Sequence, residues 1–339
     1  MAHYLKNNPK EGSLFIVCIA VFVVMSILSP TKYFAANNFG SMMTQMPELG
    51  IFALAMMMII LTGGINLSLT YVATASGIVM AMTLSALYGA GMAGPLAFLI
   101  SLLAGLAMSI GCGLLNGFLV AQMHVSPILA TLGTGILFEG ISLYLTKGHA
   151  VSGFPEFVES IGNGKIGGVV PYSLIIFVVI AIVAWLMLER MPYGRKLHMA
   201  GSNATALVYS GANVKKQLFQ VYVISAVFCF IASIIMMSRF NSMKVDYGST
   251  YMMQSILASV MGGTAITGGY GKVGGVVLAV VTLQFLSSGL NIFGLNRFLV
   301  DVVMGSLLIG VLAIHFAVDA IQRRNLLEKM QADIKEDTV

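Results

Sequence analysis

Charge is scarce in this sequence. Charged residues make up only 9% of the 339 residues, and positions 49–138 contain no Lys, Arg, Asp or Glu. A soluble globular chain carries about 25% charged residues, so a chain this poor in charge cannot cover a surface that faces water. Because 58% of the residues are apolar, the composition excludes an ordinary soluble domain and indicates a membrane protein.

Residue types that catalyse reactions or bind metals are also scarce. The three cysteines, Cys18, Cys112 and Cys229, lie in apolar runs, where they are expected to be small buried side chains and not disulfide or metal ligands. His315 and Asp319 stand one helical turn apart, which is too sparse for a metal site. The net charge of +5 is modest and dispersed, which argues against nucleic-acid binding. We expect no catalytic residue, no metal and no cofactor on this chain.

Nucleotide-binding motifs are incomplete. The stretch Gly269–Gly274 fits G-x-G-x-x-G, but it lies between two hydrophobic runs and not after a strand, so a dinucleotide site is rejected. A phosphate loop reads G-x-x-x-x-G-K-[ST], whereas here Gly271-Lys272 is followed by Val273 and position 266 is Ile. Any ATP that drives this protein must therefore be hydrolysed by another chain.

Long apolar runs occupy most of the chain. A spanning helix needs roughly 20 apolar residues, and these runs lack the alternation of a membrane β-barrel. The sequence therefore predicts an all-α integral membrane fold with about ten transmembrane helices. The predicted spans are 14–29, 49–63, 69–88, 95–121, 126–146, 171–190, 217–240, 253–268, 273–293 and 297–319. They divide the chain into an N-terminal segment (1–13), a transmembrane domain (14–319) and a tail (320–339) that reads as a short helix over 321–334.

Two predicted spans, 49–63 and 253–268, are short and end in paired glycines, Gly63-Gly64 and Gly268-Gly269. Short or broken helices at matched places in two halves of a chain often line a transport path. Two ordinary tight turns would give the same pattern, so both interpretations stay open.

The loops predict an orientation. The connection 189–216 holds five basic residues and one acid; these are Arg190, Arg195, Lys196, Lys215, Lys216 and Glu189. Cytoplasmic loops carry an excess of Lys and Arg, so this loop and both termini are predicted to be cytoplasmic, while loop 147–170 faces outside. The first apolar run is interpreted as an uncleaved span. The exception to the charge rule is the outer loop after residue 240, where Arg239 and Lys244 face only Asp246.

The segment 61–70 contains several polar residues among apolar ones. Asn66 can accept a backbone N–H at the start of the next helix, and Ser68 and Thr70 place hydroxyls at membrane depth. This segment is either a lining of a substrate path or a capped turn.

A short helix is predicted inside the basic loop. Ser202 or Asn203 can cap its start and Gly211 can end it. Ala204, Leu207 and Val208 follow helical spacing and form an apolar edge that can bury in a groove of a partner; a surface helix without a partner is the alternative.

Two acids fall inside predicted spans. A charge at the bilayer centre costs about 2.5–3.5 kcal/mol on insertion scales. Glu139 and Asp301 therefore either serve transport or a proton relay, or anchor the structure; Asp301 is placed to pair with Arg297 one turn earlier.

Six segments, in order, carry a family resemblance. They are Gly63–Ser68, Gly113–Gly117, Ala130–Gly133, Gly194-Arg195 with Gly201–Ala204 and Ser210-Gly211, Gly262–Thr264, and Gly268–Gly271. Over residues 45–315 the chain resembles the permease subunits of ribose-, xylose-, arabinose- and galactoside-type ABC importers. It departs from them at Asn66, where the family has an acid, and at Leu69-Thr70, where the family has a small flexible pair.

The resemblance implies a transport subunit, not an enzyme, in a bacterial inner membrane. It implies a second permease chain (same or sister), a cytoplasmic ATPase pair and an extracytoplasmic solute-binding protein. The solute is a simple sugar or a sugar-like molecule; related importers carry autoinducer 2 or nucleosides, and wider relatives carry branched-chain amino acids. An ion-coupled secondary transporter is the alternative function.

The resemblance also suggests site residues. Candidates for the substrate path are Asn66, Ser68, Asn116, Thr131, Gln254 and Thr264. Candidates for ATPase coupling are Asn203, Ala204, Leu207, Val208, Tyr209, Ser210 and Gly211.

Overall fold

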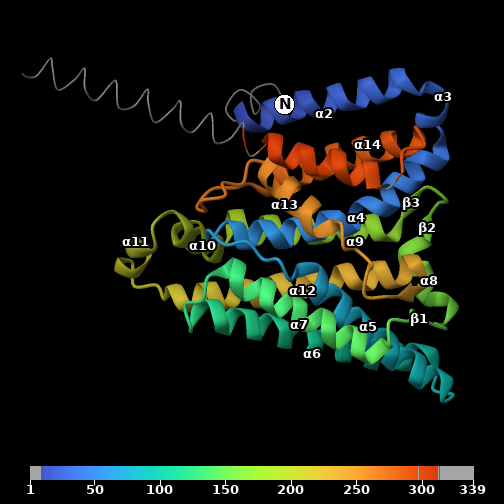
Figure 1. Cartoon of the computed structure of the whole chain (residues 1–339), viewed down its shortest axis with the longest axis horizontal. Coiled ribbons are helices and arrows are strands. Elements are labelled where there is room, and N and C mark those ends of the chain that lie inside the picture. Colours follow the sequence, from blue (N-terminus) through green and yellow to red (C-terminus); the bar gives the residue numbers. More distant parts are fainter. Residues whose placement is uncertain (1–8, 297, 312, 314–339) are drawn as a thin grey trace, which may run out of the picture. The chain divides into compact units, whose positions relative to one another are not determined.

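The computed structural model describes residues 9–296, 298–311 and 313, and these are mostly helical (Figure 1). The helices are α2 (Pro9–Leu28), α3 (Pro30–Tyr33), α4 (Ala36–Ile60), α5 (Leu69–Gly89), α6 (Gly94–Ala121), α7 (Pro127–Thr146), α8 (Glu156–Asn163), α9 (Tyr172–Trp185), the π-helix η1 (Leu186–Arg190), α10 (Pro192–Ser202), α11 (Ala204–Tyr209), α12 (Val214–Phe240), α13 (Tyr251–Met261) and α14 (Val273–Ile292). The strands are β1 (Val151–Ser152), β2 (Lys165–Ile166), β3 (Val170–Pro171) and β4 (Ser242–Met243).

The chain divides into two units that meet after Leu295, and the second unit contains the helix Phe298–Val311. Four parts of the sequence prediction lie outside the described residues: the N-terminal positions 1–8, Arg297 with its pairing to Asp301, the end of the span 297–319 with His315 and Asp319, and the tail 320–339 with its predicted helix.

The predicted all-α membrane fold is confirmed. Seven helices are long and apolar enough to cross a membrane: α4, α5, α6, α7, α9 continued through η1, α12 and α14. Three shorter apolar helices, Leu14–Leu28, Tyr251–Met261 and Phe298–Val311, coincide with the other three predicted spans. The chain is therefore a multi-pass membrane protein.

The predicted short span 49–63 is wrong. It is the second half of α4, a helix of 25 residues that begins at Ala36. Its first half escaped prediction because Asn37, Ser41 and Gln45 interrupt the apolar pattern and Pro47 usually ends a helix. In contrast, a short helix is present within the predicted span 253–268, but α13 ends at Met261, seven residues before the predicted end.

Helix α4 is the central element of the first unit. It packs against α9, α12, α13 and α14, and every side chain from Ile51 to Ile60 is fully buried. Around it, α6 lies close to α12 because Gly113 has no side chain. A Cβ atom there would be 2.8 Å from the Cβ of Ala226 and 2.9 Å from the Cα of Val223. The small residue thus allows the close helix approach expected of a G-x-x-x-G segment.

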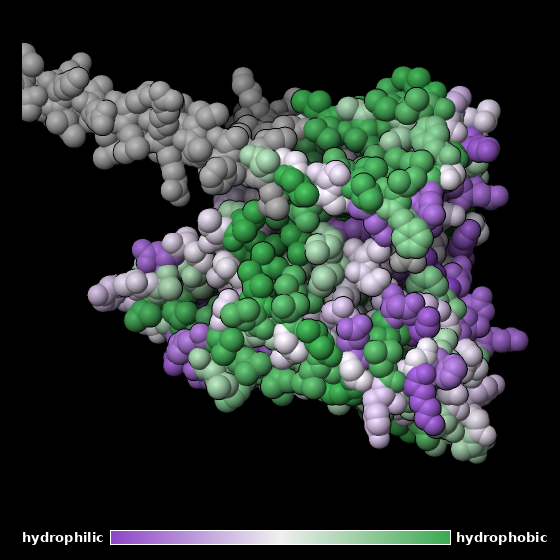
Figure 2. All heavy atoms as spheres, in the orientation of Figure 1, coloured by the Kyte–Doolittle hydropathy of each residue, from purple (hydrophilic) through white to green (hydrophobic). Residues whose placement is uncertain are grey.

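Loops from distant parts of the chain gather at two ends. Strand β1 pairs with β4 in an antiparallel register, Val151 opposite Met243, and α8 packs on the end of α12. We call this end the sheet side. The other end, which we call the basic side, carries α10 and α11. Figure 2 shows hydrophilic residues gathered at both ends, with hydrophobic surface between them.

An ion pair fastens α4 to α12 near the sheet side. The guanidinium of Arg239 donates from Nε to Oε1 of Glu48 at 2.6 Å and from Nη2 to Oε2 at 2.7 Å. The hydroxyl of Tyr251 on α13 donates to Oε2 at 2.8 Å. Since Glu48 is fully buried, its charge is balanced entirely by these groups.

This pairing also accounts for the one loop that departed from the charge rule. Arg239 is neutralised by Glu48, a residue of another helix, and Lys244 pairs with Asp246 at 3.2 Å. The basic excess therefore remains on the side of α10 and α11.

Removing the cation of the buried pair should destabilise the fold. Arg239→Met leaves the Glu48 carboxylate buried alone, which costs about 3–5 kcal/mol of unfolding free energy, whereas Glu48→Met with Arg239→Met should recover most of it. Equilibrium unfolding of the purified chain in detergent measures both. Lys244→Met, in an exposed pair, is the control and should cost only about 0–1 kcal/mol. Equal losses in Arg239→Met and Lys244→Met would contradict this account.

Candidate functional site

The first part of the site is the turn between α4 and α5. Helix α4 ends at Ile60, and Gly63 has a φ of 81°, a left-handed conformation that glycine adopts without strain. Beyond it, Oδ1 of Asn66 accepts hydrogen bonds from the Ser68 backbone N–H at 2.9 Å and from the Ser68 hydroxyl at 2.7 Å. Asn66 therefore does accept a backbone N–H, but it does not cap α5 as predicted, because Ser68 is the residue at the N-cap and the bond from Asn66 closes the turn just before the helix.

A polar network continues from this turn into α6 and α7. The Asn116 amide donates to the Ser68 hydroxyl at 2.8 Å, and the Thr134 hydroxyl donates to Oδ1 of Asn116 at 2.5 Å. The Leu67 backbone N–H donates to the Thr131 hydroxyl at 3.0 Å. We call Asn66, Ser68, Asn116, Thr131 and Thr134 the polar network. All five side chains are buried, so the network holds the turn firmly against two helices.

Four of the six residues predicted for the substrate path are therefore brought together, and Thr134 was missed. It sits one turn after Thr131 on α7, so helical spacing was the signal that could have found it. The other two residues stand apart from the network. Gln254 is partly buried on α13, and Thr264 is buried just beyond the end of α13. Within the described residues the Thr264 hydroxyl has no hydrogen-bond partner.

The second part of the site is a contact among four glycines, Gly63, Gly201, Gly268 and Gly269, which we call the glycine junction. A Cβ atom on Gly268 would lie 2.7 Å from the Gly63 nitrogen and 3.0 Å from the Cα of Gly201. The Gly269 N–H donates to the Leu61 carbonyl at 2.9 Å. The two paired-glycine turns that the sequence marked thus touch each other, and α10 lies against both.

Two side chains of the basic side reinforce this junction. Oε1 of Glu189 accepts the Val273 N–H at 3.0 Å, which satisfies a free donor at the start of α14. Nδ1 of His198 lies 3.0 Å from the Gly269 carbonyl. On α10 itself, burial raises the pKa of Tyr193 above its ordinary value. The stretch η1–α10 is therefore attached to the turn that precedes α14.

The predicted short helix of the basic loop is present as α11. Oδ1 of Asn203 accepts the Ala206 N–H at 2.9 Å, and Gly211 follows the helix with a φ of 78°. The sequence did not anticipate α10, the longer helix before it. It also misassigned the outward edge: Leu207 is fully buried inside the chain, whereas Val208 and Tyr209 are 58% and 88% exposed.

The two acids predicted inside spans have different surroundings. Glu139 is partly buried on α7, and within the described residues it makes no hydrogen bond or ion pair. Asp301 belongs to the second unit and is partly buried there. Their roles stay predictions.

These features define a class: a polytopic membrane protein in which a basic loop contacts two glycine turns. The sequence matches, over residues 38–312, the family described as "Branched-chain amino acid transport system / permease component". The chain belongs to this permease family and is a transport subunit, not an enzyme.

Similar proteins with curated names are also permeases. The D-allose transport system permease protein AlsC of Escherichia coli (strain K12) is 30% identical over 90% of this chain and 91% of its own length. The autoinducer 2 import system permease protein LsrD of Salmonella paratyphi B is 35% identical over 78% of each chain. Its counterpart in Escherichia coli (strain SMS-3-5) is 34% identical over 78% of this chain and 79% of its own. No solved structure matches the chain.

A side chain at position 201 should disrupt the glycine junction. In Gly201→Ala the added methyl group would lie 2.5 Å from the Gly269 nitrogen and still closer to the Leu61 carbonyl. Such overpacking costs about 1–3 kcal/mol, and the thermal unfolding temperature should fall. Gly140→Ala on α7 is the matched control, since its methyl group meets nothing within 4 Å. If the two variants unfold at the same temperature, the junction is not tightly packed.

Proposed function

We propose that this chain is the membrane-spanning permease subunit of an ABC importer for a simple sugar or sugar-like solute. The observation that carries the proposal is the glycine junction, where a basic loop touches both glycine turns. The AlsC and LsrD relatives support a sugar or autoinducer 2 as solute, whereas the family description names branched-chain amino acids.

The sequence lacks a Walker A site, so a separate ATPase supplies the energy, and no cofactor is needed on this chain. The basic side faces the cytoplasm of a bacterial cell, in agreement with the excess of Lys and Arg in its loop. Both termini lie on the same side, in the inner membrane. A second permease chain and an extracytoplasmic binding protein complete the importer.

The ATPase docks on α11 through exposed atoms. Val208 and Tyr209 project from the chain, and beside them a groove of about 550 Å³ is lined by nine residues. They are Ala121, His124, Val208, Gly211, Ala212, Asn213, Val214, Lys215 and Leu218. A force applied to this loop reaches both glycine turns because α10 contacts them directly. Buried Leu207 fixes α11 to the chain and does not itself face the partner.

Transport should depend on ATP. Proteoliposomes that hold this chain with its ATPase and binding protein should concentrate labelled D-allose or autoinducer 2 only with ATP on the basic side. The chain alone, under a proton or sodium gradient, should not. Glu139, which makes no hydrogen bond or ion pair within the described residues although Tyr71 lies near enough to be affected by its charge, is the observation that favours the ion-coupled alternative. Gradient-driven accumulation by the chain alone, abolished in Glu139→Gln, would establish that alternative.

A charge on α11 should release the ATPase. Tyr209→Glu places an unpaired carboxylate in the contact, which costs at least about 2 kcal/mol, so ATPase affinity should fall at least about thirtyfold. Co-purification from membranes measures this. Ile166→Glu, at a half-exposed site of the sheet side, is the control and should bind normally. If Tyr209→Glu still co-purifies with the ATPase as the wild type does, the docking surface lies elsewhere. Binding of a cytoplasmic ATPase to α11 would in addition support the orientation in which the basic side faces the cytoplasm.

A further inference from the structure

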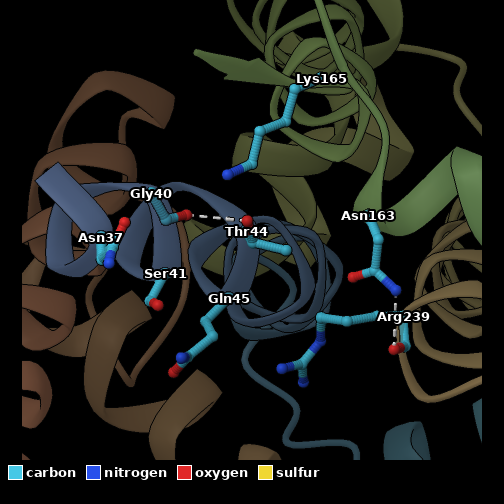
Figure 3. A pocket seen from close by; sticks show the side chains of 8 residues that line it. All are labelled: Asn37, Gly40, Ser41, Thr44, Gln45, Asn163, Lys165 and Arg239. Atoms are coloured by element: carbon cyan, nitrogen blue, oxygen red, sulfur yellow. Dashed lines mark hydrogen bonds between the residues drawn. The ribbon is translucent and has the colours of Figure 1, made fainter. Parts of the chain in front are cut away.

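A polar pocket of about 470 Å³ opens at the sheet side, where α4 begins (Figure 3). Its lining comes from the first turns of α4, the end of α8, the start of β2 and the end of α12. The lining residues are Asn37, Gly40, Ser41, Thr44, Gln45, Asn163, Lys165 and Arg239. Its volume falls within the range of about 300–1,000 Å³ that is usual for small-molecule sites.

Gly40 gives the pocket its depth. Asn37 and Thr44 lie one helical turn before and after it on the same face of α4, and Ser41 is adjacent in sequence, so the missing side chain leaves a gap among polar groups. A Cβ atom on Gly40 would lie 3.5 Å from Nζ of Lys165. Figure 3 shows the Lys165 side chain extending toward α4 on the side where Gly40 and Thr44 lie.

Hydrogen-bonding capacity is left unused in this pocket. Within the described residues, the side chains of Asn37, Ser41, Gln45 and Lys165 have no hydrogen bond or ion pair. Asn163 uses its amide N–H on the Arg239 carbonyl at 3.1 Å, which leaves its own oxygen available. Amide groups present a donor beside an acceptor, and hydroxyl groups both donate and accept. This set therefore suits a ligand with several adjacent hydroxyls.

The charge of the pocket selects among such ligands. Arg239 is committed to Glu48, so Lys165 is the uncompensated charge among the lining residues. The eight lining residues include no carboxylate, so a cationic ligand would find repulsion and no counterion. The other polar side chains of the lining, from Asn37, Ser41, Thr44, Gln45 and Asn163, are neutral amides and hydroxyls, and the Lys165 ammonium can itself donate to hydroxyl oxygens. Among the described lining residues, five neutral polar groups beside one free cation favour a neutral polyhydroxylated ligand.

We propose that this pocket is an entry site where a neutral, polyhydroxylated solute first contacts the permease. The assignment rests on the proposed function, which puts the sheet side outside the cell. Helix α4 runs without a break from this pocket to the turn that contains Gly63, so it joins the pocket to the glycine junction.

The first experiment is protection from labelling. Ser41→Cys is made in the full-length chain with the buried Cys18, Cys112 and Cys229 replaced by Ser, and its maleimide labelling rate is measured in nanodiscs. The probes are D-allose, D-ribose and autoinducer 2, with cationic D-glucosamine as a comparison. A bound solute slows labelling by the factor 1 + [L]/Kd, about elevenfold at ten times Kd. Ser160→Cys, exposed on α8 of the same side, should label at the same rate with or without solute.

The second experiment places a larger side chain at position 40, where the glycine leaves the pocket open. A Cβ atom at position 40 would meet only the flexible end of Lys165, so in Gly40→Leu α4 should fold normally while the rest of the leucine side chain occupies the pocket. In the complete importer the KM for the transported solute should rise at least about tenfold, with normal expression. Gly140→Leu, on an open face of α7, is the control with unchanged KM.

The outcomes separate this inference from the proposed function. Uptake by the wild-type importer tests the function alone. If the wild type transports a solute that fails to protect Ser41→Cys, and Gly40→Leu keeps its KM, the entry site is refuted while the importer stands. If the binding protein without solute protects Ser41→Cys from labelling, the pocket is part of a docking surface and the entry site is refuted. Equal protection of Ser41→Cys by D-glucosamine would also refute it.

Discussion

The bidentate pair between Glu48 and Arg239 governs how the helices of the first unit are joined. It connects α4 to α12 and, through the Tyr251 hydroxyl, to α13. A buried carboxylate is tolerable only when its acceptor sites are filled, and two guanidinium N–H groups with one phenol do so here. The pair therefore fixes the position of α4 along its own axis relative to α12 and α13. Because the helix is continuous, the pair also fixes the position of its other end and of the turn that follows.

At the end of α4 that precedes Gly63, the constraint is that backbone N–H and C=O groups need hydrogen-bond partners. A chain that interrupts its helices inside a membrane must pair the freed N–H and C=O groups with other protein atoms. The structure does this by bringing two turns together, so that the Gly269 N–H reaches the Leu61 carbonyl. Only residues without side chains permit so close an approach. Glycine at these positions thus serves contact between segments as much as the shape of each turn.

The sequence predicted elements well and contacts poorly. Apolar runs located the seven long helices and three shorter apolar ones, although they gave only the second half of α4, and glycine pairs marked both turns, because these signals are local. The first half of α4 was lost because its polar face, from Asn37 to Gln45, lines a pocket that hydropathy does not register. The outward direction of α11 was also misjudged: Leu207 and Tyr209 look equally able to face a partner until the packing of the loop is known. The pairing of Glu48 with Arg239 joins residues far apart in the chain and left no local signal.

That separation has a consequence for how the protein is made. Glu48 and Arg239 are 191 positions apart, and at about 5–20 residues per second the ribosome needs roughly 10–40 s to pass from one to the other. Throughout this interval α4 carries a carboxylate whose cation has not been synthesised. With one of the two lowest mean hydropathies of the seven long helices, α4 depends on a partner that emerges late. The pairing that neutralises Glu48 is therefore an event of the last third of translation, although α4 is the second apolar helix to leave the ribosome.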